Sequence, residues 1–296
     1  MDATEYDIIV VDNGSRDGSV SYLRNEFPNV SVFPQDTNLG FAAGCNIGMR
    51  HALAKDFEYI LLINNDTAVD SGFLTALLEQ AQREPGAAIV SPKIYFYDYP
   101  DRFWWAGGVF STWVGIPEHV GRKQPDIGQY DLAAPIDWAT GCAVLIRCDA
   151  LRQVGLFDEK LFGNGEDLEL SLRMRNAGYR IWFAPRAKIW HKEGIDYRKN
   201  AGEHTRIFTG TRNLLWIMHR HAGPIKWISF LPNFVCRYAL FYILLSIWRG
   251  DFRSAKAVCE GILAFVRMRF HPECSPLPAE LKVRGKRSGP KRVETD

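Results

Sequence analysis

The chain has 296 residues, of which 47% are hydrophobic and 24% are charged, as is usual for a folded globular protein. Its net charge of +2 does not indicate a nucleic-acid partner, and we expect none. The six cysteines show no CxxC or zinc-like spacing, which favours a reducing, cytosolic compartment. The first six residues are acidic and lack an apolar stretch, so we predict no signal peptide.

The first two-thirds of the chain alternate short apolar runs with segments of helical periodicity. The apolar runs predict strands and the periodic segments predict helices. This order favours an α/β domain with a mostly parallel sheet flanked by helices. The expected strands are 8–11, 30–33, 59–63, 88–91, 143–147, 181–184 and 188–190, and the expected helices are 20–27, 41–54, 73–81 and 166–177. Between residues 95 and 135 we expect an irregular excursion or a long hairpin.

The character of the chain changes at Pro224, after which residues 227–248 are nearly all apolar. An amphipathic helix is expected around 255–266, and a basic segment follows it. Arg237 would cost about 2.5–3.5 kcal/mol at the centre of a membrane. We therefore favour a helical hairpin that lies in the membrane interface. The alternative is a helical pair packed on the first domain.

The expected domains are therefore an α/β domain at 1–222, a helical hairpin at 223–272 and a disordered basic tail at 273–296.

The strand predicted at 59–63 is followed directly by Asn64, Asn65 and Asp66. Ligands of open α/β sheets bind beyond the carboxyl ends of the strands. Carboxylate and amide oxygens suit Mg²⁺ or Mn²⁺, which commonly bind together with a diphosphate. The same residues also suit an ordinary strand-to-helix turn.

Two other segments could face a nucleotide. Asp12 ends the first strand, where its carboxylate can accept a hydrogen bond from a base or simply support the turn. The segment 38–46 opens a helix with small residues, and such a helix start can face phosphate or sugar. This second signal is weak by itself.

The adjacent acids Glu166 and Asp167 lie in the first turn of a predicted helix that we expect Asn164 to cap. The helix dipole favours acids there, which accounts for one of them. Two together are more typical of a site in which one carboxylate acts as a base and the other holds an acceptor. His191 follows a predicted strand and is either a structural histidine or a metal ligand.

Together these segments resemble the family 2 glycosyltransferases with a GT-A fold, most closely the rhamnosyltransferase-like branch. The resemblance covers roughly residues 7–220 and keeps the family's order of motifs. It is carried by IIVVDNGS (8–15), NLGFAAGCNIG (38–48), YILLINND (59–66), DWATGCAVLIR (137–147), GLFDEKLFGNGEDLELSLR (155–173) and the context of His191.

The resemblance implies roles for the matched residues. Asp167 would be the general base, and Asp66 and His191 would bind Mg²⁺ or Mn²⁺. The implied substrate-binding residues are Asp12, Asn38, Gly40, Asn46, Asn64, Trp138, Gly141 and Glu166. Of these, Asp12 would contact the nucleobase, Asn38, Gly40 and Asn46 would line the nucleotide-sugar pocket, and Trp138, Gly141 and Glu166 would shape the acceptor site.

The implied activity is an inverting, metal-dependent sugar transfer, for instance of L-rhamnose from dTDP-rhamnose. The acceptor would be a cell-surface glycan or lipid-linked precursor, reached by peripheral contact at the cytoplasmic face of the cell membrane. A single base without a covalent nucleophile predicts inversion. A sugar-1-phosphate nucleotidyltransferase would need a Gly-rich basic phosphate loop near the N-terminus, which is not seen. A non-catalytic sugar-nucleotide-binding protein, associated with the membrane and possessing only part of the domain, stays open.

One departure from the family concerns the first strand. Relatives begin with an additional strand and helix, and that strand lies between those matching 8–11 and 59–63. Only seven residues precede the first motif here. We expect either a truncated or misassigned start, which would leave strand edges exposed, or direct pairing of the two flanking strands.

Overall fold

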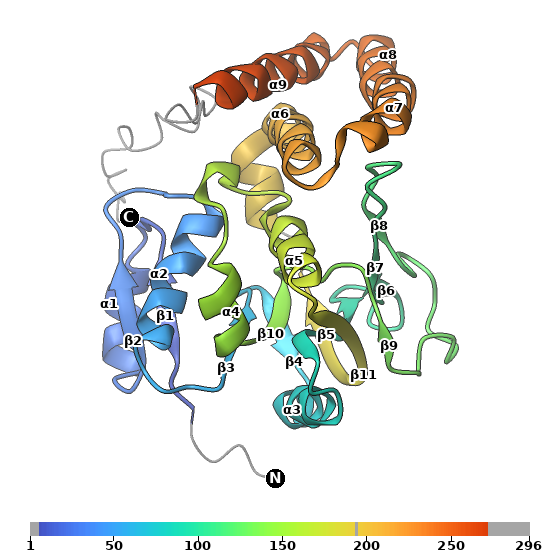
Figure 1. The fold of residues 1–296 in the computed structure, drawn as a ribbon. Coiled ribbons are helices and arrows are strands. Elements are labelled where there is room, and N and C mark those ends of the chain that lie inside the picture. Colours follow the sequence, from blue (N-terminus) through green and yellow to red (C-terminus); the bar gives the residue numbers. More distant parts are fainter. Residues whose placement is uncertain (1–5, 193–194, 272–296) are drawn as a thin grey trace, which may run out of the picture.

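The structure, a computed structural model, describes residues 6–192 and 195–271, and for 195–201 the backbone alone. Figure 1 shows an α/β body with helices gathered at one end. The strands are β1 (Ile9–Asp12), β2 (Ser31–Pro34), β3 (Tyr59–Ile63), β4 (Thr67–Val69), β5 (Ala87–Phe96), β6 (Phe103–Trp105), β7 (Gly108–Val109), β8 (Glu118–His119), β9 (Ala134–Pro135), β10 (Ala143–Arg147) and β11 (Arg180–His191). The helices are α1 (Ser19–Glu26), α2 (Phe41–Leu53), α3 (Phe73–Arg83), α4 (Cys148–Val154), α5 (Glu166–Asn176), α6 (Ile195–His221), α7 (Pro224–Asn233), α8 (Leu240–Trp248) and α9 (Phe252–Phe270), with a 3₁₀ turn at Glu159–Leu161 and a π-helical turn at Phe234–Ala239.

The main sheet has the strand order β3–β10–β5–β11–β4, with β6 added to β5 and β9 added to β11. The predicted α/β class, a central sheet flanked by helices with a helical C-terminal appendage, is confirmed. Parallel pairing is less extensive than we expected. Within this sheet only β5 and β11 pair in parallel, because β10 runs antiparallel to both β3 and β5.

The central strand β5 is buried along its whole length. The apolar run predicted a strand at 88–91 only, but the observed strand continues through Pro92 and the charged Lys93. In the structure the Lys93 ammonium is paired with Asp126 at 3.1 Å and Asp131 at 2.6 Å, so the strand can continue through a buried charge. The two short strands predicted at 181–184 and 188–190 are one strand, β11, with a register shift between Ala184 and Lys188.

The N-terminal strands form a separate two-stranded parallel sheet, β1–β2. Strand β3 pairs with β10 on one edge, and among residues 6–192 and 195–271 no strand pairs with its other edge. Of the two alternatives for the start of the chain, direct pairing of 8–11 with 59–63 is therefore not observed. Ile8, just before β1, is 47% exposed, and Ile63, at the end of β3, is 42% exposed.

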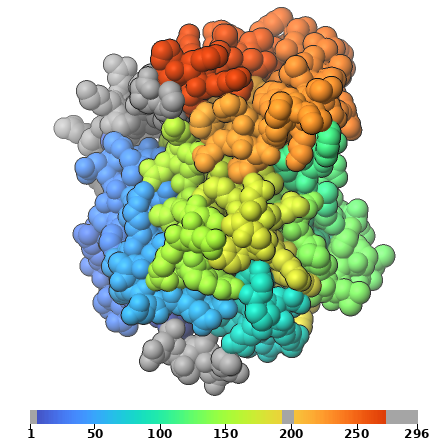
Figure 2. All heavy atoms as spheres, in the orientation of Figure 1, coloured from blue at the N-terminus to red at the C-terminus, as the bar shows by residue number. Residues whose placement is uncertain are grey.

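The C-terminal helices pack on the body through α6, which lies along α9. Figure 2 shows residues 224–270 gathered at one end of the molecule. The apolar segment forms α7, the π-helical turn and α8 as one continuous helix, and α8 then packs against α9. By length and composition alone, 224–248 is one helix that could cross a membrane, and only 17% of its most apolar window is buried. The basic tail predicted at 273–296 lies outside the described residues.

Candidate active site

The ends of three strands meet at one corner of the main sheet. The backbone N–H of Asn64, just after β3, donates to the carbonyl of Cys142 at 2.8 Å. Strand β4 pairs with the end of β11, so that Thr67 lies opposite His191. This pairing brings the Asp66 Oδ1 to 3.2 Å from the His191 Nε2. The two predicted metal ligands, 125 positions apart in the chain, are therefore neighbours.

The two adjacent acids begin α5 next to this corner. Asp167 accepts hydrogen bonds from the backbone N–H of Gly141 at 2.9 Å and of Leu168 at 2.8 Å. The Glu166 side chain is buried, and its Oε2 has no hydrogen-bond partner within the described part of the chain. Cys142 lies between the two halves of the site. Burial raises the pKa of its thiol, and the charges of both Asp66 and Asp167 raise it further.

The two carboxyl groups differ in how easily they ionise. Burial, with the charge of Asp167 beside it, raises the pKa of Glu166 to about 8. Burial also raises the pKa of Asp167, but the N–H groups of Gly141 and Leu168 oppose the shift by stabilising the carboxylate. Near neutral pH we therefore assign the negative charge to Asp167 and the proton to Glu166. An ionised Asp167 is the form that can accept a proton from a hydroxyl group.

These acids face a cavity of about 830 Å³. Its lining residues are Trp104, Pro117, Glu118, His119, Arg122, Trp138, Thr140, Asn164, Gly165, Glu166, Asp167, Leu168, His191 and Arg206. One wall is aromatic, with ring centroids 4.7 Å apart for Trp104 and His191 and 5.3 Å apart for His119 and Trp138. Burial, reinforced by Arg122, lowers the pKa of His119 to about 4, so this imidazole is neutral near pH 7. The size and lining suit a small polar ligand with an apolar face.

The loop that precedes α5 has an unusual backbone. Phe162, Asn164 and Gly165 all have positive φ, at 58°, 71° and 93°. The N-cap of α5 is Gly165, so the predicted capping role of Asn164 is wrong. The Asn164 side chain instead donates to the Thr209 hydroxyl on α6 at 2.8 Å.

Helix α6 holds this loop from one side. The buried Asn213 amide nitrogen lies 2.8, 3.0 and 2.7 Å from the carbonyls of Leu161, Gly163 and Asn164. Next to it, the buried Arg212 guanidinium donates to the carbonyls of Lys160 and Leu161. Left-handed backbone at non-glycine residues is costly and persists where surrounding contacts fix it. These contacts therefore set the position from which Glu166 and Asp167 enter the cavity.

The residues predicted to bind the nucleotide lie on β1 and the start of α2. Asp12 is buried at the end of β1 and accepts from the Ser15 N–H at 3.0 Å. Asn38 accepts from the Gly40 N–H at 2.8 Å. A Cβ at Gly40 would lie 2.5 Å from Phe162, so glycine is required where α2 meets the loop before α5. Contact of these residues with a nucleotide stays a prediction.

Asn46 bonds to the segment before α5, and its contact with a nucleotide sugar stays a prediction. Its amide accepts from the Phe157 N–H at 3.0 Å and donates to the Phe157 carbonyl at 3.0 Å and to Glu159 at 2.9 Å. Because its donor and acceptor groups all bond to protein, Asn46 ties α2 to the segment before α5. It does not line the cavity that holds the acids.

Three predicted site residues remain, Trp138, Gly141 and Asn64. Trp138 lines the cavity, and Gly141 donates to the Asp167 carboxylate. A Cβ at Gly141 would lie 3.0 Å from the Phe41 ring, so little room exists for a side chain there. Asn64 accepts from the Thr67 hydroxyl through its carbonyl at 2.7 Å and so shapes the turn that carries Asp66.

The donor set at the corner fits a divalent ion that binds with its substrate. Asp66 offers oxygen and His191 offers nitrogen, and the His191 Nδ1 has no hydrogen-bond partner among residues 6–192 and 195–271. No group of three or more His, Cys, Asp or Glu side chains in that part of the chain could hold a metal alone. Mg²⁺ is typically bound by one or two carboxylates together with substrate phosphates, and two protein ligands are consistent with that arrangement.

Several cavity residues carried no role in the sequence analysis, among them Trp104, His119, Arg122 and Arg206. The first three lie in the excursion 97–135, where the regular elements are two or three residues long and show no periodicity. The only available signal was the density of aromatic residues. Arg206 lies on α6, whose sequence indicates a helix but not which face meets a cavity.

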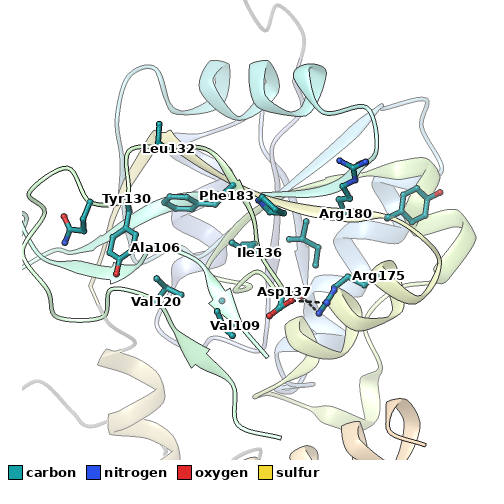
Figure 3. Close-up of a pocket in the computed structure, with 16 residues that line it drawn as sticks. Ala106, Val109, Val120, Tyr130, Leu132, Ile136, Asp137, Arg175, Arg180 and Phe183 are labelled. Atoms are coloured by element: carbon teal, nitrogen blue, oxygen red, sulfur yellow. Dashed lines mark hydrogen bonds and ion pairs between the residues drawn. The ribbon is translucent and has the colours of Figure 1, made fainter. Parts of the chain in front are cut away.

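A second cavity, of about 620 Å³, lies between the excursion, the end of α5 and β11 (Figure 3). Asp137 and Arg175 form an ion pair across it at 3.0 Å. Its walls include Tyr130, Ile136 and Phe183, but none of the predicted site residues. Glu166, Asp167, the aromatic wall and His191 line the first cavity and not the second.

Residues 2–155 match the family model described as glycosyl transferase family 2. The chain is 27% identical over 243 residues, 74% of this chain and 78% of the relative, to the N-acetylglucosaminyl-diphospho-decaprenol L-rhamnosyltransferase of Mycobacterium tuberculosis strain H37Rv. It is 31% identical over 239 residues, 75% of this chain and 78% of the relative, to the galactofuranosyltransferase GlfT1 of Mycolicibacterium smegmatis.

Among solved structures, the mannosyltransferase PcManGT from Pyrobaculum calidifontis in complex with GDP-Man and Mn²⁺ matches at a TM-score of 0.49 and 15% identity, over 90% of this chain and 66% of that one.

The chain belongs to glycosyl transferase family 2. The predicted family is thereby confirmed, and the protein is a glycosyltransferase.

Proposed function

We propose that the protein is an inverting, divalent-metal-dependent glycosyltransferase that moves L-rhamnose from dTDP-rhamnose to a lipid-linked precursor of a cell-surface glycan. The observation that carries the proposal is that Asp167, which lines the cavity, and the turn that carries Asp66 beside His191 both contact the segment Gly141–Cys142. The similarity to the mycobacterial rhamnosyltransferase supports the choice of sugar and acceptor.

In the proposed reaction, Asp167 accepts the proton of the acceptor hydroxyl as that oxygen attacks the anomeric carbon of the donor. The N–H groups of Gly141 and Leu168 hold the carboxylate toward the cavity. Glu166, protonated below pH about 8, can donate a hydrogen bond to the acceptor. The attack inverts the anomeric carbon because the chain uses one base and no covalent nucleophile.

Asp66 and His191 would hold Mg²⁺ or Mn²⁺. When bound with the donor diphosphate, such an ion neutralises the charge that develops on the leaving group. Asp12, Asn38 and Gly40 lie on the neighbouring β1–α2 side and are the proposed nucleotide contacts.

The C-terminal helices would rest on the inner face of the cell membrane. Large apolar side chains on them are exposed, among them Ile228 at 76%, Leu244 at 63% and Trp248 at 82%. An exposed apolar surface of this kind is costly in water and is typical of an interaction site. Membrane contact would bring the cavity to a lipid-linked acceptor.

Transfer from dTDP-rhamnose to lipid-diphosphate-linked N-acetylglucosamine in the presence of Mn²⁺ tests the proposal. We expect a product whose new bond has the anomeric configuration opposite to that of the donor, as read by NMR. A retained configuration would contradict the mechanism. Metal-dependent nucleotide binding without turnover on any sugar donor would instead favour a non-catalytic binding protein.

A further inference from the structure

The second cavity, of about 620 Å³, has no part in the proposed reaction. Three of its lining residues are charged, namely Arg175, Arg180 and Asp137, and most of the others are apolar. In Figure 3 the two arginines lie toward one end of the cavity, and Tyr130 and Leu132 lie toward the other. A cavity with a basic end and an apolar end suits a ligand that has an anionic group on an apolar body.

Arg180 is the basic group that is open to a ligand. Its backbone is fixed at the start of β11, where its N–H donates to the Gly86 carbonyl at 2.9 Å. Its guanidinium makes no hydrogen bond or ion pair with any residue that the structure describes, and the side chain is exposed. An anion can therefore bind Arg180 without displacing a partner within the protein.

Arg175 is held in place but keeps donors in reserve. Its Nη2 lies 3.0 Å from the Asp137 Oδ1, and its side chain is 39% exposed. Asp137 also accepts from the Phe110 N–H at 3.0 Å, so this carboxylate does not depend on Arg175 alone. A guanidinium has five N–H donors in a planar fork. Arg175 can therefore keep its contact with Asp137 and bind an anion as well.

The apolar end of the cavity contains side chains that water covers poorly. Leu132 is 83% exposed and Val109 is 47% exposed, although both line a hollow. Phe183 and Ile181, which line the same cavity, are almost fully buried. Exposed apolar side chains around a hollow are typical of a ligand site. An apolar group bound there would cover Leu132 and Val109.

A thin wall separates this cavity from the catalytic one. Asp137 lines the second cavity, whereas the next residue, Trp138, lines the first. Gly108 on β7 lines the second cavity and pairs with His119 on β8, which lines the first. The two sets of lining residues share no member. A ligand in the second cavity is therefore separate from the sugar that would react at Asp167.

We propose that the second cavity binds an organic phosphate, with its phosphate on Arg175 and Arg180 and its organic group against Ile136, Phe183 and Leu132. Guanidinium groups match phosphate in geometry and charge. Two arginines and one carboxylate leave the lining with one positive charge in excess, which a phosphate offsets. A neutral sugar would leave Arg180 without a partner, and inorganic phosphate would leave Leu132 exposed.

The test uses phenyl phosphate as the probe and calorimetry as the measurement. No nucleotide and no divalent ion are added, so the corner at Asp66 and His191 is not loaded. Wild-type protein is compared with Arg175→Gln, Arg180→Gln and Arg24→Gln. Arg24 is an exposed arginine in the last turn of α1 that lines neither cavity, so its substitution makes the same change of charge elsewhere. Thermal unfolding of each protein checks that it is folded.

We expect the wild type to bind phenyl phosphate about tenfold more tightly than inorganic phosphate or benzyl alcohol, because each of these has only half of the probe. Arg175→Gln and Arg180→Gln should each weaken phenyl phosphate binding by about tenfold or more, and Arg24→Gln should bind like the wild type. No binding by the wild type, or equal binding by Arg180→Gln, would overturn the proposal. Arg180 has no partner to lose, so this variant decides the matter even if Arg175→Gln is unstable.

The apolar end is tested with Leu132→Ser. This variant should weaken phenyl phosphate binding by about fivefold and leave inorganic phosphate binding unchanged. Ile127→Ser, at a position that is 82% exposed and outside the cavity lining, is the control. Unchanged binding of phenyl phosphate by Leu132→Ser would refute the placement of the organic group. None of these measurements needs sugar transfer, so their outcome is independent of the proposed function.

Discussion

Glu166 and Asp167 follow one another in the chain but have different surroundings. Asp167 receives two backbone N–H groups, whereas the Glu166 Oε2 receives no hydrogen bond from the described residues. Two adjacent carboxylates would both be expected in the charged form in water. The folded environment separates their pKa values, which is how neighbouring acids acquire different roles.

The separation predicts a particular pH profile. Above pH about 8, Glu166 ionises, which adds a second negative charge beside Asp167 and removes a donor to the acceptor. We expect the wild-type kcat/KM to fall as the pH rises through this value, and Glu166→Gln to lack that fall. Both proteins should lose activity at low pH as Asp167, whose pKa is raised, takes up a proton. An alkaline fall that persists in Glu166→Gln would show that another group causes it.

A second residue-level prediction concerns the metal corner. Asp66→Asn removes the only carboxylate in the Asp66–His191 pair, so the affinity for a divalent ion should fall. In calorimetry, wild-type protein should bind a nucleoside diphosphate more tightly with Mn²⁺ than without, by about tenfold or more, the effect of one strong charged contact. Asp66→Asn should bind it equally in both conditions. Retained Mn²⁺ dependence would contradict the assignment.

At the scale of elements, helix α6 determines where α5 begins. Asn213 is fully buried and contacts three carbonyls of the loop 161–164. Asn213→Ala leaves the carbonyls of Gly163 and Asn164 without this donor, while the Leu161 carbonyl keeps its contact with Arg212. The loss should cost roughly 1–3 kcal/mol of unfolding free energy. It should also lower kcat, because the loop positions Asp167.

Thermal unfolding and steady-state kinetics measure the two effects of Asn213→Ala. Asn29→Ala, at an exposed position in the turn before β2, is the control. If Asn213→Ala loses stability but keeps its kcat, the loop contacts stabilise the fold without positioning the base.

The elements also explain what could be predicted from the sequence. The strand at 59–63 and the start of α5 at Glu166 follow from apolar runs and acids at fixed positions, and both are observed. The second half of β5 was not predicted. It contains the buried Lys93, whose ion-pair partners lie more than 30 positions away in the sequence. Long-range pairing of this kind leaves no local pattern.

The site was predicted less evenly than the fold. The neighbourhood of Asp66 and His191 is as the family motifs implied, because both lie at strand ends in one sheet. The observed contacts of Asn46 and Asn164 could not be predicted from the local sequence, since their amides bond to residues 111 and 45 positions away. The aromatic wall could not be predicted, because β6 and β8 are too short to show a period.

At the scale of the whole molecule, helices α7, α8 and α9 lie together at one end (Figure 2), and several of their large apolar side chains are exposed. This arrangement predicts binding to vesicles that contain anionic lipid. Ile228→Glu with Leu244→Glu places two charges on the exposed apolar face. On a vesicle these two apolar side chains would be buried in lipid, each contributing about 1.5–3 kcal/mol. Their replacement should reduce vesicle co-sedimentation by more than tenfold.

The control for membrane binding is Ile127→Glu, an isoleucine 82% exposed in the excursion. It should bind vesicles like the wild type. Equal sedimentation of all three proteins would mean that α7 and α8 do not form the membrane contact.

The central claim is that Asp167 is the base of a sugar transfer carried out in this cavity. The most direct measurement is the turnover of Asp167→Asn beside that of the wild type, with Mn²⁺-dependent nucleoside diphosphate binding measured on both. We expect turnover to fall by about 10²–10⁴-fold while nucleotide affinity stays the same. Full turnover in Asp167→Asn would contradict the claim.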